Sequence, residues 1–170
     1  MNARSLKALE YPKIIAMLES KAATSYGKEL AAALLPTGKL DLAIAWQAET
    51  REGLDLYRLA GGVSLGGVKD LRPALLRLDK AGVLTIDQLL DIANTIYAGN
   101  RVKRTLTSFV QVELIPHLHG LADQLSELKD LEGTIRAAID EMGEIKDTAT
   151  PELKRIRQQI ASAESKLKAK

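Results

Sequence analysis

The sequence predicts an all-α protein, and three observations support this fold class. Leu and Ala supply 51 of the 170 residues, and both residue types favour helix. Aromatic residues make up only 4% of the chain, so few strand-favouring side chains are available for a large sheet. Pro and Gly separate segments of helical period. We expect a multi-helix core and a long C-terminal helix, with at most a small hairpin near residues 142–148.

Helix boundary signals divide the first half of the chain. The Pro36-Thr37-Gly38 stretch breaks the chain, and Asp41 is placed to cap the long helix that follows. The apolar residues Ile14, Ile15 and Leu18 are expected on the inner face of the first helix. A glycine-rich loop, residues 61–67, follows the long helix. The expected helices cover about residues 12–23, 26–35, 41–59 and 70–82.

The second half begins with a capping-box pattern. Thr85 and Gln88 form T-x-x-Q, which predicts a helix running to about Leu106. One or two further helices are expected between residues 112 and 139, with interruptions near Pro116 and Gly120. The MGEIKDT segment breaks the helical period, and the last helix then starts at residues 150–151.

The last helix carries the clearest periodic signal. Its apolar residues are spaced 3, 4, 3 and 4 apart, as in a coiled-coil seam of just over two heptads. Such a seam needs a partner helix, so we expect the sequence to stop inside a longer helix. The expected organisation is a helical core over residues 1–140, a connector or small hairpin over 141–150, and a truncated long helix over 151–170. The seam consists of Leu153, Ile156, Ile160, Ala163 and Leu167.

The charge distribution suggests nucleic-acid contacts near the C-terminus. The chain has 24 basic and 22 acidic residues, and a net charge of +2 alone does not indicate nucleic acid. Residues 151–170, however, carry six bases and two acids, and such a helix can attract phosphates. The alternative is a solvated helix face, and a second basic cluster at residues 101–104 is already accounted for by the helix dipole. The candidate contacts are Lys154, Arg155, Arg157, Lys166, Lys168, Arg101, Lys103 and Arg104.

No catalytic, cofactor-binding or metal-ligating set is predicted. The absence of Cys excludes disulfides and thiolate metal sites. The glycine-rich GGVSLGGVKD segment lacks the Lys-Ser/Thr ending of a phosphate-binding loop. His117 and His119 have no nearby carboxylate in the sequence to complete a metal site, so a surface or half-buried loop pair is favoured. No apolar run approaches the roughly 20 residues of a membrane span, and no signal peptide is visible. These features predict a cytoplasmic protein without a membrane partner.

Four sequence stretches stand in an order that resembles a known family. They are LEYPKII, TSYGKEL, LGGVKDLRPALLRLDKAGVL and GEIKDTATPELKRIRQQI. Together they resemble the N-terminal region of the second bacterial type of MutS protein. The resemblance implies a helical core that leads into a lever helix and a clamp. It places the ATPase, with ATP and Mg, and an Smr endonuclease module elsewhere in the parent protein, so no catalytic residue carries over to this chain.

The resemblance also implies a function. The parent would be a cytoplasmic homodimer that binds branched or mismatched DNA, restrains homologous recombination and, in some members, acts on stalled ribosomes. This chain would be its non-catalytic core and lever module, relaying motion between the ATPase and the clamp, with weak DNA binding of its own. The alternative is a helical interaction or dimerisation domain without nucleic-acid binding. Nucleic-acid affinity and its salt dependence would separate these two functions.

Overall fold

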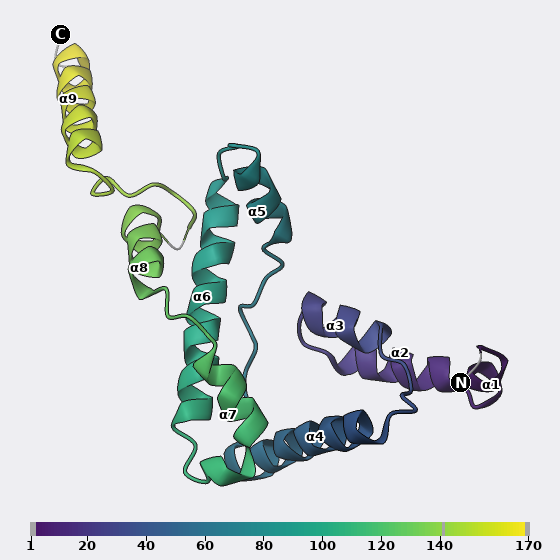
Figure 1. The fold of residues 1–170 in the computed structure, drawn as a ribbon. Helices are drawn as coiled ribbons and strands as arrows, with labels where there is room; N and C mark the ends of the chain where they lie inside the picture. Colours follow the sequence, from purple (N-terminus) through teal and green to yellow (C-terminus); the bar gives the residue numbers. More distant parts are fainter. Residues whose placement is uncertain (1–2, 141, 169–170) are drawn as a thin grey trace. The chain divides into compact units, whose positions relative to one another are not determined.

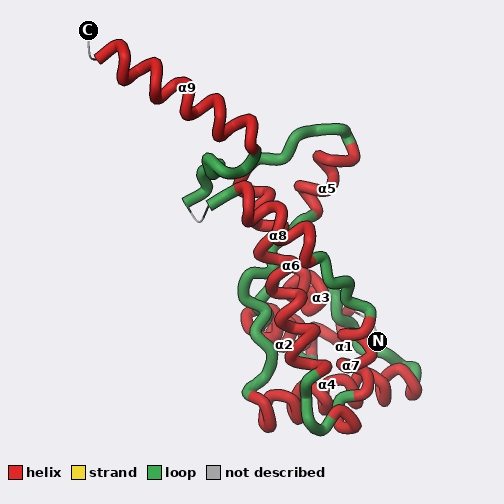
Figure 2. Tube along the Cα trace, turned by 90° about the vertical axis from the view of Figure 1, so that its left-hand side faces the viewer, coloured by secondary structure: helices red, strands yellow, loops and turns green. Residues whose placement is uncertain are grey.

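The all-α prediction is confirmed by a computed structural model of the chain, which describes residues 3–140 and 142–168 (Figure 1). Helix makes up 69% of the structure, and no strand occurs in the described ranges (Figure 2). No helix in these ranges is long and apolar enough to cross a membrane. The helices are α1 Ala3–Ala8, α2 Tyr11–Lys21, α3 Ser25–Ala32, α4 Leu40–Ala60, α5 Arg72–Asp79, α6 Ile86–Thr107, the 3₁₀ turn η1 Val112–Leu114, α7 Pro116–Asp123, α8 Lys129–Ala138 and α9 Pro151–Lys168.

Local capping signals account for several helix ends. The capping box is confirmed, because the Thr85 N–H donates to Gln88 Oε1 at 3.0 Å and the Gln88 N–H donates to Thr85 Oγ1 at 3.3 Å. Gly61 ends α4 with a φ of 73°, a left-handed conformation that favours glycine. Asp41 is not the cap of α4. The helix already begins at Leu40, so this carboxylate lies in the first turn.

Two expectations about the helices are wrong. Ile14 and Leu18 are 57% and 45% exposed, and of the three residues expected on the inner face only Ile15 is half-buried. The helix α2 contains no buried residue. Gly120 does not interrupt the chain, since α7 runs through it. Pro116 instead occupies the first position of α7, where its missing N–H costs no hydrogen bond.

The segment after α8 forms the small extended element expected there. Ile139 and Ile145 make an isolated antiparallel bridge. The Asp140 N–H donates to the Glu144 carbonyl at 2.9 Å, and Asp140 Oδ1 accepts from the Glu144 N–H at 2.8 Å. The Asp140 side chain therefore organises this turn.

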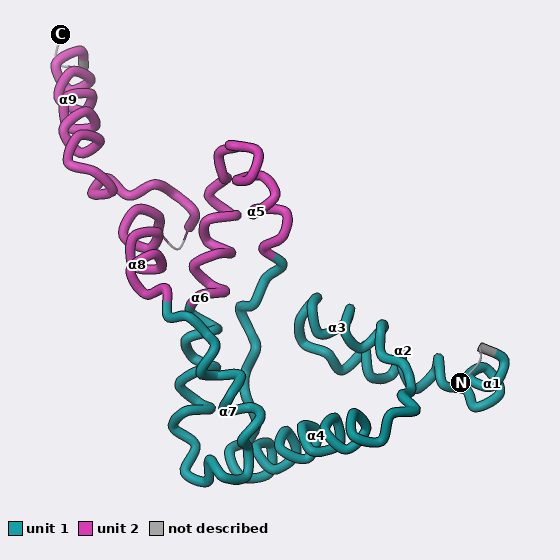
Figure 3. Tube along the Cα trace, viewed as in Figure 1, with its two compact units in different colours: residues 1–70, 97–127 teal, residues 71–96, 128–170 magenta. Residues whose placement is uncertain are grey.

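The chain divides into two compact units, each with its own small core (Figure 3). Unit 1 comprises residues 1–70 and 97–127, and unit 2 comprises 71–96 and 128–170. Unit 1 buries Leu56, Leu106, Ile115 and Ala122, and unit 2 buries Ala93, Ile135 and Ile139. The boundaries at 140 and 150 inferred from the sequence stay a prediction.

Candidate nucleic-acid interface

The helix α9 presents an increasingly exposed apolar stripe. Thr150 Oγ1 accepts a hydrogen bond from the Leu153 N–H at 3.1 Å, which caps the helix. Leu153 is half-buried, whereas Ile156, Ile160 and Leu167 are 42%, 53% and 75% exposed, and Ala163 is also exposed. The seam is therefore packed at its beginning and open to solvent along the rest of its length.

Three cations on α9 are exposed and available for an anionic partner. Lys154, Arg155 and Lys166 all lie on the solvent-exposed surface. No described residue makes a hydrogen bond or ion pair with their side chains. The side chain of Lys168, a further candidate, lies outside the described part of the chain. Two of the three cations occupy the first turns, where the helix dipole disfavours positive charge.

Arg157 differs from these neighbours because its side chain has partners among the other residues of unit 2. Its guanidinium pairs with the Asp147 carboxylate and donates from Nη1 to the Ile145 carbonyl at 3.1 Å. The pair ties the second turn of α9 to the segment before it. A counter-ion already balances this charge, so Arg157 is a weaker candidate for a phosphate contact than Lys154 or Arg155.

The second basic cluster lies on α6 and is mostly directed inward. Arg101 Nη2 donates to the Ser64 carbonyl at 3.1 Å and to the Gly66 carbonyl at 2.8 Å. Lys103 Nζ donates to the Leu125 carbonyl at 2.8 Å. Arg104 is exposed. The three residues belong to unit 1 and the α9 cations to unit 2.

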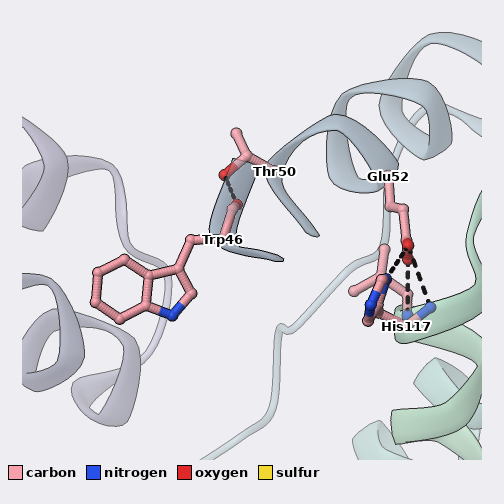
Figure 4. Close-up of polar contacts among 5 residues, drawn as sticks. Trp46, Thr50, Glu52 and His117 are labelled. Carbon is pink, nitrogen blue, oxygen red and sulfur yellow. Dashed lines mark hydrogen bonds and ion pairs between the residues drawn. The ribbon is translucent and has the colours of Figure 1, made fainter. Parts of the chain in front are cut away.

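The most elaborate buried polar contact joins α4 to α7 and was not predicted from the sequence (Figure 4). Glu52 is only 5% exposed. Its Oε1 accepts from the His117 N–H at 3.2 Å and lies 2.5 Å from His117 Nδ1. Its Oε2 accepts from the Leu118 N–H at 2.9 Å. Glu52 therefore caps α7 from another helix, supplying acceptors that the N-terminal turn lacks.

The contact shifts both titratable groups toward their charged forms. Burial alone raises the pKa of Glu52, but the hydrogen bonds from Leu118 and His117 outweigh it and hold the pKa below its ordinary 4.5. The Glu52 carboxylate raises the pKa of His117 above 6.5, first through the hydrogen bond and then through its charge. His119 lies 3.5 Å from Asp123 instead. In the described ranges, no three His, Asp or Glu side chains gather as metal ligands.

The sequence is similar along its whole length to bacterial proteins named endonuclease MutS2. No family model matches it. Its relatives include proteins of that name from Brevibacillus brevis, at 41% identity over all of this chain, and from Halalkalibacterium halodurans, at 36% over 98%. A third, from Symbiobacterium thermophilum, is 38% identical over 99%. The chain spans 21–22% of the length of these curated relatives. Because they match it from end to end, the chain corresponds to a part of a MutS2-type protein.

Proposed function

We propose that this chain is a non-catalytic core and lever module of a DNA-binding protein of the MutS2 type. It would act in the cytoplasm, within a homodimer, on branched or mismatched DNA or on the nucleic acid of stalled ribosomes. Suppression of homologous recombination is the proposed role of the whole protein. The observation that carries the proposal is the row of exposed cations on α9, in a chain whose relatives are named endonucleases.

A lever role suits the construction of α9. Its 18 residues form one helix, whose length is roughly 27 Å at 1.5 Å per residue. Backbone hydrogen bonds inside a helix let it move as a rigid body. The Arg157–Asp147 pair and the half-buried Leu153 fix only its first turns. Motion of unit 2 would therefore be carried along the helix toward whatever binds its far end.

The test of DNA binding is the salt dependence of affinity. The chain is expected to bind a 30-base-pair duplex without sequence preference, with a Kd of about 10⁻⁴ to 10⁻⁶ M. Replacing Lys154, Arg155 and Lys166 together by Gln should lower the slope of log K against log salt by up to about 2.7, since each lost phosphate contact contributes about 0.9. Fluorescence anisotropy at four salt concentrations measures this slope.

The matched control for this triple variant is Arg157→Gln. Arg157 lies on the same helix, but its charge is balanced by Asp147, so the slope should change by much less than one contact. If the triple variant shows an unchanged slope of log K against log salt, Lys154, Arg155 and Lys166 do not contact DNA. Equal slope changes per residue in both variants would contradict the distinction between free and paired cations.

A second candidate function is a helical interaction or dimerisation domain, and the exposed stripe on α9 favours it. Ile156, Ile160 and Leu167 present apolar surface at coiled-coil spacing. Under this function the salt slope stays near zero, and the chain self-associates or captures a partner helix. Sedimentation of Ile160→Lys beside the unmodified chain would detect self-association through this stripe.

The chain by itself is expected to leave ATP unbound. A phosphate-binding loop turns backbone N–H groups toward the anion, whereas the glycine-rich loop here turns two carbonyl oxygens toward Arg101. ATP and Mg would thus bind elsewhere in the parent protein. Calorimetric titration with Mg-ATP should give no heat of binding, and a dissociation constant in the micromolar range would contradict this expectation.

A further inference from the structure

The backbone passes between the two units at three places. Along the sequence, these crossings fall at residues 70/71, at 96/97 within α6, and at 127/128. The first crossing follows the glycine-rich loop, and the third follows the segment after α7. Two basic side chains of α6, Arg101 and Lys103, lie five and seven residues beyond the second crossing. Both contact the segments that lead to the other two.

Arg101 holds the segment before the first crossing. Its Nη2 lies 3.1 Å from the Ser64 carbonyl oxygen, 3.2 Å from Ser64 Oγ and 2.8 Å from the Gly66 carbonyl oxygen. The guanidinium also lies over the Tyr97 ring, 5.9 Å from its centroid. Oxygen atoms of the loop and an aromatic face thus surround one cation. The two carbonyl oxygens and the ring face are partners for positive charge and not for phosphate.

Lys103 holds the segment before the third crossing. Its Nζ donates to the Leu125 carbonyl at 2.8 Å and lies 3.8 Å from Glu127 Oε1. The Lys103 side chain is only 24% exposed, whereas the Glu127 side chain is 42% exposed, so the hydrogen bond to the Leu125 carbonyl is the better shielded of the two contacts. Leu125 and Glu127 are the last part of unit 1 before the chain enters unit 2.

We infer that Arg101 and Lys103 form a latch inside unit 1, which fastens residues 64–66 and 125–127 to α6. The glycine-rich loop, residues 61–67, is called the receptor of this latch, because its carbonyl oxygens accept hydrogen bonds from the Arg101 guanidinium. The segments before the first and third crossings are therefore fastened to one helix, α6. Releasing the latch would free both segments while α6 remained intact. The inference depends only on contacts within unit 1 and not on DNA binding.

Glycine is required at one position of the receptor and not at its neighbour. Gly67 has a φ of 97°, which strains any other residue. Gly66 has no such φ, and a Cβ added there would meet Ser64 Oγ at 3.6 Å and Arg101 Nη2 at 4.0 Å, which are ordinary contact distances. Gly67→Ala should therefore distort the receptor, whereas Gly66→Ala should leave the latch in place.

Hydrogen exchange of the whole 170-residue chain tests the latch. The Val68 N–H, which donates to the Leu65 carbonyl, reports on the receptor loop, and the Leu125 N–H, which donates to the Ala122 carbonyl, reports on the other segment. Arg101→Gln should speed exchange at Val68 about tenfold, equivalent to about 1.4 kcal/mol of local stability. Lys103→Gln should do the same at Leu125, and Gly67→Ala should reproduce the effect of Arg101→Gln.

Two controls keep the result interpretable. Arg104→Gln removes an exposed cation from the same turn of α6 and should leave both amides unchanged, as should Gly66→Ala at Val68. Circular dichroism must show equal helix content in all variants, and Arg101→Lys substitutes if Arg101→Gln fails to fold, since a single ammonium cannot reproduce the guanidinium contacts. Unchanged exchange at Val68 in a folded Arg101 variant would overturn the latch. So would equal acceleration in Arg104→Gln.

Discussion

Replacing Glu52 by Ala is expected to lower the free energy of unfolding by about 1.5–3 kcal/mol, the range for hydrogen bonds to a charged group. The change leaves the His117 and Leu118 N–H groups at the start of α7 without their acceptor. It also removes a side chain that is 5% exposed from the contact between α4 and α7. Urea unfolding measures the loss. Arg51→Gln, an exposed change on the same helix, should stay within about 0.5 kcal/mol of the unmodified chain.

The same contact predicts how stability depends on pH. His117 has a raised pKa, so its contribution is complete below 6.5 and is lost as the pH rises through the folded-state value. Glu52 has a lowered pKa, so its contribution is complete above 4.5 and is lost as the pH falls through the folded-state value. The pair therefore stabilises the fold most between pH 4.5 and 6.5.

Two variants separate the acidic and alkaline limbs of this profile. His117→Gln should remove the alkaline limb and keep the acidic one, because the two backbone N–H groups still donate to Glu52. Glu52→Gln should remove both limbs. Unfolding free energies are compared with those of the unmodified chain between pH 3.5 and 8, so that other titrating groups cancel. If the unfolding free energies of the variants and the unmodified chain differ by a constant amount at every pH, the contact contributes nothing to the pH dependence.

The sequence predicted the parts of this fold that depend on local signals. The capping box at Thr85 and Gln88 and the short extended element after α8 each depend on residues within a few positions of one another. The helix α1 was not predicted, and the inner face of α2 was predicted wrongly. In both places the exposure of a residue depends on what packs against its helix. Ile14 has the helical spacing of a core residue and is nevertheless 57% exposed.

The contacts that define the candidate sites could not be predicted in the same way. Glu52 and His117 are 65 residues apart, and Arg101 is 37 residues from Ser64. Nothing in the local pattern pairs them, since Glu52, His117 and Arg101 are ordinary polar residues on helices and Ser64 is an ordinary polar residue in a loop. From the sequence alone the helix dipole accounts for the charge of Arg101, although its guanidinium donates to carbonyl oxygens of the glycine-rich loop. A weak sequence signal existed for that loop, because its glycines indicated an unusual backbone without indicating what it binds.

The seam of α9 leads to the last prediction, which compares its two ends. Leu153→Ala should lower the free energy of unfolding by about 2 kcal/mol, the lower end for truncating a packed Leu, because Leu153 is half-buried. Leu167 is 75% exposed, so Leu167→Ala should change it by less than about 0.5 kcal/mol. Urea unfolding of both variants at low protein concentration measures this difference.

Protein concentration shows what covers the far end of the seam. If a second copy pairs with it, the unmodified chain melts at a higher temperature as the concentration rises, because association stabilises the folded state by mass action. Leu167→Ala should then abolish that rise, whereas Leu153→Ala lowers the melting temperature at every concentration. A melting temperature independent of concentration indicates a far end that remains exposed, as a lever awaiting a partner helix would be. Equal losses at Leu153 and Leu167 at low concentration would instead mean that α9 packs along its full length on its own unit, and the lever role would fail.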